Sequence, residues 1–161
     1  MDYDREIITQ SPEETAKVGE ELAHQLRTQN AELNDQRRGL GKATVVCLYG
    51  ELGSGKTTFA QGFARGLGIT SRLLSPTFII VRRYQVPQTK NYLYHLDLYR
   101  ISGEQDMAGL GISEILADSG SYVLIEWAEK LKNQLPQRRI DIVFKTLDDG
   151  RHSIWTSFKK P

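Results

Sequence analysis

The sequence predicts an α/β fold in which helices flank a mixed, mostly parallel β-sheet. Three observations support this prediction. A β-branched-rich apolar run at 43–49 enters a glycine-rich turn, and a helical pattern begins directly after that turn. An amphipathic helical pattern precedes this unit, and short apolar runs of strand character follow it. The chain has 161 residues, a length typical of one compact domain, so we expect a single domain over 1–161.

The overall composition is that of a globular protein. Hydrophobic residues make up 39% of the chain and charged residues 25%. The 21 lysines and arginines nearly balance the 20 acidic residues. A free-standing nucleic-acid binder usually relies on a net basic field, so this balance argues against that class of protein.

Cysteine usage and the chain start predict a cytoplasmic protein without membrane contact. Cys47 is the one cysteine of the sequence and lies in an apolar run, which favours a core position in a reducing compartment. The first ten residues are acidic and lack the layout of a signal peptide. The longest apolar runs are too short to cross a bilayer.

The first helix is predicted from Ser11 to about Gln29. Ser11 is a capping residue, Pro12 fits the first turn, and the acids at 13–14 favour the positive helix end. Four-residue spacing of apolar side chains marks its buried face: Val18, Leu22 and Leu26. The polar stretch 29–42 shows no clear period, and we expect it to be a long connection.

The central strand is predicted at 43–49, buried and parallel to its neighbours. A helix is expected from about Lys56 to Leu67, closed by Gly68. Further strands are predicted at 77–84, 92–98, 122–126, 139–145 and 152–158. Residues 103–119 predict one or two short helices, broken by glycine. The turn at 148–150 joins the last two strands as a hairpin, so we expect one antiparallel edge.

Residues 50–57 match the phosphate-binding pattern G-x-x-x-x-G-K-[ST]. Gly50, Gly53 and Gly55 allow positive φ and close approach of the backbone to phosphate oxygens. The backbone N–H groups and the helix N-terminus then form an anion site. In this pattern Lys56 reaches the β- and γ-phosphates, and the Thr57 hydroxyl binds Mg²⁺. The strand–loop–helix context supports the match and predicts a bound nucleotide with Mg²⁺.

A P-loop enzyme needs an acidic residue at the end of a neighbouring strand, to hold Mg²⁺ or its water. Two positions qualify. Glu126 ends the apolar run 122–126, and Asp97 ends the run 93–97. The residues alone do not decide which acid contacts the metal directly.

The absence of known elements narrows the class of P-loop protein. The sequence has no N-K-x-D element to read guanine, which favours ATP, and no L-S-G-G-Q element of transporter ATPases. Two alternatives to an ATPase stay open. One is a small-molecule P-loop kinase, although no arginine-rich helical lid is evident after the P-loop helix. The other is a nucleotide-sensing binding module without turnover.

Four segments together resemble the TsaE (YjeE) family, the ATPase component of bacterial tRNA threonylcarbamoyladenosine biosynthesis. They are GELGSGKTTF (50–59), SPTF (75–78), HLDLYR (95–100) and IEW (125–127). The P-loop alone is unspecific, but the combination in this order is highly specific. The similarity extends from Ser11 to Pro136. Ala128 departs from the family pattern, in which proline commonly follows Glu-Trp.

The resemblance implies a set of partners. Such proteins act with TsaB and TsaD, and TsaD transfers threonylcarbamoyl onto an adenosine of tRNAs that read codons beginning with A. ATP hydrolysis by the TsaE-like subunit resets the complex between turnovers, so contact with tRNA is expected only through the complex.

The resemblance also assigns roles to residues. The phosphates are cradled by Gly53, Ser54, Gly55, Lys56, Thr57 and Thr58. Thr57 and Glu126 bind Mg²⁺, and Asp97 is the acid needed for hydrolysis. Thr77, in the segment 75–77, belongs to a loop that senses the γ-phosphate, and Trp127 packs near the nucleotide.

Several of these residues also have ordinary structural interpretations. Thr77 fits a plain strand start. His95 and Asp97 share one face of a strand, so His95 either orients Asp97, lines a partner surface or packs in the core. Arg100 either reaches a phosphate or forms a salt bridge. The tyrosines at 84, 92, 94 and 99 are expected to pack on strands.

Overall fold

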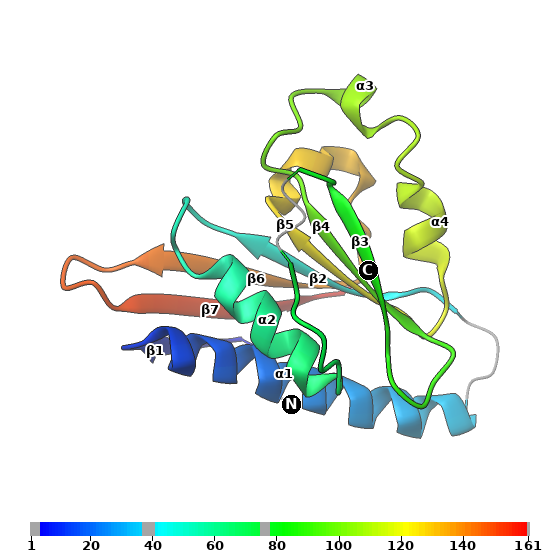
Figure 1. The fold of residues 1–161 in the computed structure, drawn as a ribbon, viewed down its shortest axis with the longest axis horizontal. Coiled ribbons are helices and arrows are strands. Elements are labelled where there is room, and N and C mark those ends of the chain that lie inside the picture. The colour runs from blue at the N-terminus through cyan, green and yellow to red at the C-terminus, as the bar shows by residue number, and fades with distance from the viewer. Residues whose placement is uncertain (1–3, 37–40, 75–77, 161) are drawn as a thin grey trace.

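The computed structural model describes residues 4–36, 41–74 and 78–160. Its elements in chain order are β1 (Arg5–Thr9), α1 (Pro12–Gln36), β2 (Thr44–Tyr49), α2 (Lys56–Gly66), β3 (Val81–Gln85), β4 (Tyr92–Asp97), α3 (Glu104–Met107), α4 (Ile112–Ala117), β5 (Tyr122–Glu126), the 3₁₀ helix η1 (Ala128–Gln134), β6 (Arg139–Thr146) and β7 (His152–Lys159). Within these residues the strands form a seven-stranded sheet in the order β1-β7-β6-β2-β5-β4-β3 (Figure 1).

The predicted mixed α/β fold is confirmed. The central strands β6, β2, β5 and β4 pair in parallel. Antiparallel strands border this centre on both sides, with β7 and β1 beyond β6 and with β3 beyond β4. We expected an antiparallel pair at one edge only, because the hairpin at 148–150 was the single local signal for one.

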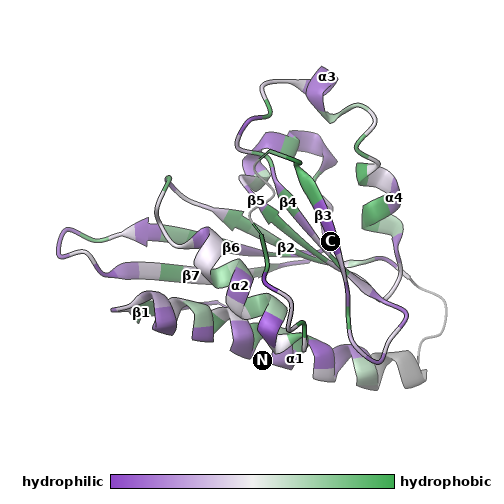
Figure 2. Ribbon diagram, viewed as in Figure 1, coloured by the Kyte–Doolittle hydropathy of each residue, from purple (hydrophilic) through white to green (hydrophobic). Residues whose placement is uncertain are grey.

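Helices cover both faces of the sheet, over two apolar cores. On one face α1 and α2 pack over a core that includes Leu48, Phe59, Phe63 and Leu124. On the other face the segment from α3 to α4, together with η1, covers a second core around Val45, Cys47 and Ile125. Figure 2 shows hydrophobic residues along β2 and β5, which are buried between the two layers.

Cys47 lies at the centre of the second core, as predicted. Burial raises the pKa of its thiol to about 12. Thiolate is the nucleophilic form of cysteine, so this thiol is unreactive at neutral pH. Among the described residues, no helix combines the length and apolar character that a membrane span requires.

The start of α1 agrees with the prediction, but its end does not. The Ser11 hydroxyl accepts a hydrogen bond from Glu14 N–H at 3.1 Å, and the Glu14 carboxylate accepts one from Gln10 N–H at 2.7 Å. The helix continues to Gln36, so the connection predicted for 29–42 is wrong over residues 29–36. Ala31, Glu32, Leu33 and Gln36 have high helix propensity, which favours continuing the helix although this stretch has no apolar period.

Other boundaries also differ from the prediction. The strand predicted from Thr77 begins at Val81, because residues 78–80 form a turn in which Ile80 has a φ of 70°. Thr77 itself lies outside the described residues. The strand β1 and the helix η1 were not predicted at all. The short helices between 103 and 119 and the hairpin at 148–150 are confirmed.

Glycines allow α1 and α2 to pack with their backbones in close approach. A Cβ at Gly62 would collide with the carbonyl of Ala16, and one at Gly19 would collide with the carbonyl of Phe59. An added Cβ at either glycine would meet backbone atoms, so no change of side-chain rotamer could make room for it. Glycine at these positions therefore allows α2 to pack this closely on α1.

Replacing Gly62 with alanine is expected to lower the free energy of unfolding by about 1–3 kcal/mol, through overpacking between α1 and α2. The direction of this change in stability tests the helix contact, because Gly→Ala in a helix without such a contact stabilises by about 1 kcal/mol. Denaturant unfolding measures the difference. Gly103→Ala is the control, since a Cβ there meets nothing within 4 Å. A Gly62→Ala variant as stable as the parent would show that the helices are not in this close contact.

Candidate functional site

The candidate site lies where the carboxyl ends of three parallel strands face the start of α2. The loop after β2 leads into α2, β4 ends at Asp97 and β5 ends at Glu126. Asp97 and Glu126 are register partners on adjacent strands, so their side chains project on the same side of the sheet. This edge is where ligands bind in open α/β sheets.

The loop 50–55 has the conformation that the glycine pattern predicts. Gly50, Gly53 and Gly55 have φ values of 145°, 77° and 105°. A side chain is disfavoured at such angles, and a Cβ at Gly50 would also lie 2.6 Å from the Phe144 carbonyl. Gly55 directly precedes α2, so the free N–H groups of the first helical turn open into this loop.

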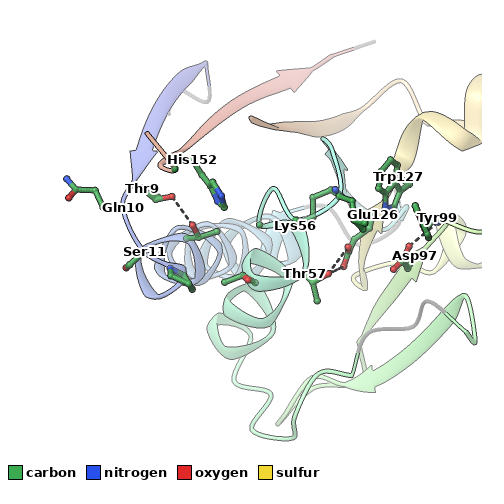
Figure 3. A pocket seen from close by; sticks show the side chains of 17 residues that line it. Thr9, Gln10, Ser11, Lys56, Thr57, Asp97, Tyr99, Glu126, Trp127 and His152 are labelled. Atoms are coloured by element: carbon green, nitrogen blue, oxygen red, sulfur yellow. Dashed lines mark hydrogen bonds between the residues drawn. The ribbon is translucent and has the colours of Figure 1, made fainter. Parts of the chain in front are cut away.

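Thr57 and Glu126 meet at the start of α2. The Thr57 hydroxyl donates to the two carboxylate oxygens of Glu126, at 3.0 Å and 3.2 Å. Figure 3 shows the two side chains pointing toward one another. Glu126 is only 2% exposed, so this carboxylate is held by neighbours rather than by bulk water.

Asp97 lies beside Glu126 and faces the same cleft. One of its carboxylate oxygens accepts a hydrogen bond from the Tyr99 N–H at 3.0 Å, which fixes the turn after β4. The carboxylate is 4% exposed. Two carboxylates thus stand together at the foot of the cleft.

Lys56 folds back over the glycine loop. Its ammonium donates to the carbonyls of Gly50 at 2.6 Å and Glu51 at 2.7 Å, and it lies 4.3 Å from the centre of the Trp127 ring. Burial lowers the pKa of Lys56 from its ordinary value, while nearby acids, Glu126 first among them, act in the opposite direction. Lys56 therefore places its ammonium between the carbonyls of the loop and the Trp127 ring.

Trp127 has a left-handed backbone, with φ at 59°, and its N–H donates to the Leu48 carbonyl at 3.1 Å. This bond ties the end of β5 to the end of β2. The Tyr99 ring packs against the indole with 5.1 Å between ring centres. The prediction that Tyr99 packs on a strand is wrong, because Tyr99 lies in the turn after β4 and forms an aromatic wall with Trp127.

A cleft of about 570 Å³ runs from this aromatic wall across the loop. Part of the lining comes from residues that the sequence did not suggest for the site: Thr9, Gln10, Ser11, Pro12, Thr15, Gly150 and His152. Leu52, within the loop itself, also lines the cleft. Figure 3 shows His152 and Thr9 on the side of Lys56 opposite to Trp127. They come from the β1–α1 turn and from the start of β7, which no local pattern connects to the P-loop.

The structure brings most of the predicted site residues to this cleft. Lining residues from the prediction are Gly53, Gly55, Lys56, Thr57, Thr58, Asp97, Glu126 and Trp127. Gly50 and Ser54 belong to the same loop but do not line the cleft, and the Ser54 hydroxyl is 3.4 Å from the Lys56 ammonium. Thr77 lies outside the described residues.

The structure excludes one alternative predicted for His95, and for Arg100 it shows a contact that was not predicted. His95 is fully buried, so it does not line a partner surface, and its Nε2 lies 2.8 Å from Glu126 Oε1. The Arg100 guanidinium lies over the Phe78 ring, 4.4 Å from its centre. This contact places Arg100 beside an exposed aromatic ring.

The oxygen donors at this site fit Mg²⁺. A hydroxyl and a carboxylate converge at the start of α2, and Mg²⁺ prefers oxygen ligands. Among the described residues, no cluster of three or more His, Cys, Asp or Glu side chains could hold a metal alone. Such a cluster is not needed, because Mg²⁺ in nucleotide sites keeps waters and takes substrate phosphates as ligands.

A family profile described as "Threonylcarbamoyl adenosine biosynthesis protein TsaE" matches residues 9–154. Among curated proteins, the tRNA threonylcarbamoyladenosine biosynthesis protein TsaE of Bacillus subtilis is 44% identical over 110 residues, which cover 68% of this chain and 66% of the relative. The protein of the same name from Treponema pallidum is 38% identical, over 73% of this chain and 84% of the relative.

A solved structure shares the fold. The crystal structure of Bacillus subtilis YdiB superposes with a TM-score of 0.70 at 32% sequence identity. The match covers 96% of this chain and 85% of that chain.

Proposed function

The chain belongs to the TsaE family of threonylcarbamoyl adenosine biosynthesis proteins, and on that premise we propose that it is the Mg²⁺-dependent ATPase subunit of tRNA threonylcarbamoyladenosine modification. It works in the cytoplasm with TsaB and TsaD, and its ATP hydrolysis resets their complex between turnovers. The observation that carries the proposal is the meeting of Thr57 and Glu126 at the start of α2, with Asp97 beside them.

Each residue of the cleft has a part in this proposal. Backbone N–H groups of the loop and of the first turn of α2 bind the phosphates, and Lys56 neutralises their charge. Thr57 and Glu126 would hold Mg²⁺, which would supply Lewis-acid stabilisation of the phosphate charge. Asp97 orients the attacking water and accepts its proton. Trp127 and Tyr99 close this end of the cleft against bulk water.

The orientation of ATP follows from these roles. If the γ-phosphate lies by Lys56 and Glu126, the base must lie toward the other end of the cleft. That end is lined by the β1–α1 turn and by His152. The lack of an N-K-x-D element makes guanine recognition unexpected there, so adenine is the proposed base.

The role is tested by counting product in a reconstituted modification reaction. A limiting amount of TsaB–TsaD complex is supplied with substrates and tRNA, with and without this chain and ATP. We expect about one modified tRNA per complex without the chain, and continued turnover with it. Equal turnover in both reactions would contradict the resetting role.

Exposed apolar side chains before β3 offer a surface for the TsaB–TsaD pair. Phe78 is 83% exposed and Ile79 is 54% exposed. The Arg100 guanidinium lies over the Phe78 ring, and Arg100 directly follows Tyr99 of the aromatic wall in the chain. Exposed apolar side chains that gather beside a site mark interaction surfaces. A partner that docks here could supply the positive charge that single P-loop chains often lack for hydrolysis.

Replacing Phe78 with alanine is expected to weaken binding to TsaB–TsaD by roughly 30-fold, as loss of an exposed aromatic anchor costs about 2 kcal/mol. ATP affinity of the isolated chain stays unchanged, because Phe78 does not line the cleft. Biolayer interferometry measures the partner affinity. Trp155→Ala is the matched control, since Trp155 is an exposed aromatic residue on β7. If the two variants bind the pair equally well, the docking surface lies elsewhere.

A further inference from the structure

His95 occupies a buried position directly behind the cleft. It lies on β4, is fully buried and does not line the cleft, yet its Nε2 is 2.8 Å from Glu126 Oε1. Its strand neighbour in register is Leu124 on β5, so it stands between the apolar core and the carboxylate. No part of the proposed hydrolysis assigns it a role.

The hydrogen bond to Glu126 determines which nitrogen of the His95 ring carries the proton. An ionised carboxylate can only accept, so His95 Nε2 carries the proton and donates to Glu126. The other ring nitrogen, Nδ1, is buried without a hydrogen-bond partner among the residues that the structure describes. A buried unpaired polar atom costs about 1–3 kcal/mol. Leucine would fill the same space without this cost, so packing alone does not account for a histidine here.

The two oxygens of Glu126 have different surroundings. His95 binds Oε1, whereas the closer approach of the Thr57 hydroxyl is to Oε2, at 3.0 Å. A donor on one oxygen fixes the rotation of the carboxylate about its terminal bond. The second oxygen then faces Thr57 at the start of α2, where the proposed cation would lie.

We infer that His95 is a positioning residue, which holds the Glu126 carboxylate in the orientation that binds Mg²⁺ together with Thr57. The inference rests on the proposed function, because it assigns His95 to the metal end of that same cleft. Donors that orient a metal-binding side chain typically contribute 10–100-fold to metal affinity. His95 acts through Glu126 and touches neither nucleotide nor metal.

The test compares His95→Leu with His95→Gln in a binding experiment without turnover. Affinity for adenylyl imidodiphosphate is measured by calorimetry, first in EDTA and then over a Mg²⁺ titration. We expect His95→Leu to need about 10–100-fold more Mg²⁺ for half-maximal tightening, with its affinity in EDTA unchanged. His95→Gln keeps a donor near the position of Nε2 and is expected to recover most of the Mg²⁺ response.

A core control separates positioning from packing. Val46→Ala removes a buried side chain of β2 whose register partner on β5 is Leu124, not Glu126. We expect it to lower stability and leave the Mg²⁺ response intact. The inference is overturned if His95→Leu responds to Mg²⁺ as the parent does. It is also overturned if Val46→Ala and His95→Gln lose the Mg²⁺ response to the same extent as His95→Leu. A parent protein whose nucleotide affinity ignores Mg²⁺ would instead overturn the proposed metal site itself.

Discussion

Replacing Lys56 with alanine is expected to weaken binding of Mg-ATP by roughly 10- to 100-fold and to abolish measurable hydrolysis. Hydrogen bonds to charged groups contribute about 1.5–3 kcal/mol, and each 1.4 kcal/mol is tenfold in affinity. The Lys56 ammonium lies over the mouth of the glycine loop, within 2.7 Å of two loop carbonyls and beside the Trp127 ring. Calorimetry with the Mg²⁺ complex of adenylyl imidodiphosphate, which keeps a γ-phosphate and is not hydrolysed, measures the affinity.

Lys90→Ala is the control for this prediction. Lys90 is exposed in the turn between β3 and β4, so its loss removes one positive charge without touching the cleft. Thermal unfolding of both variants checks that the fold is retained. Nucleotide binding by Lys56→Ala at the level of Lys90→Ala would mean that the phosphates do not lie in this loop.

Replacing Asp97 with asparagine is expected to lower the rate of ATP hydrolysis by about 10²–10⁴-fold, the contribution typical of a general base. Nucleotide affinity should change only a few-fold, because Lys56, Thr57 and the loop amides remain in place. Asparagine keeps the oxygen that accepts from the Tyr99 N–H, so the turn after β4 is preserved. Single-turnover hydrolysis with TsaB–TsaD present separates the chemical step from binding.

Asp118→Asn provides the matched substitution away from the cleft. Asp118 accepts hydrogen bonds from the Tyr94 hydroxyl at 2.7 Å and from the Ser121 hydroxyl at 2.9 Å, and it has no place among the cleft residues. We expect it to hydrolyse ATP as the parent does. If Asp97→Asn hydrolyses ATP as fast as the parent, Asp97 is not the base that activates the water, and the catalytic assignment is wrong.

The parts of the site that follow from the sequence are those coded by neighbouring residues. The glycine loop, the following helix and the strand before it lie within 43–67, so local pattern and context suffice. The acids at 97 and 126 end apolar strands, and parallel strands place such ends at one edge of the sheet. The resemblance to the TsaE family, carried by motifs in a fixed order, added the pathway, and it is the source of the proposed partners.

What the sequence did not predict depends on contacts between distant segments. The strand β1 spans five residues, and among the described strands it pairs only with β7, at the opposite end of the chain. Because β1 leads into the β1–α1 turn, the far wall of the cleft was missed together with it. His95 was associated with Asp97 through its spacing on one strand, but its bond to Glu126 needs the register of β4 against β5.

The most direct test of the whole account is phosphate release from Mg-ATP, measured for the chain alone and with the TsaB–TsaD pair of the same organism. The account predicts slow release by the isolated chain, a clear rise with the pair, and dependence on Mg²⁺ in both cases. Release that is unchanged by the pair, or undetectable with it, would contradict the proposed partner-dependent ATPase.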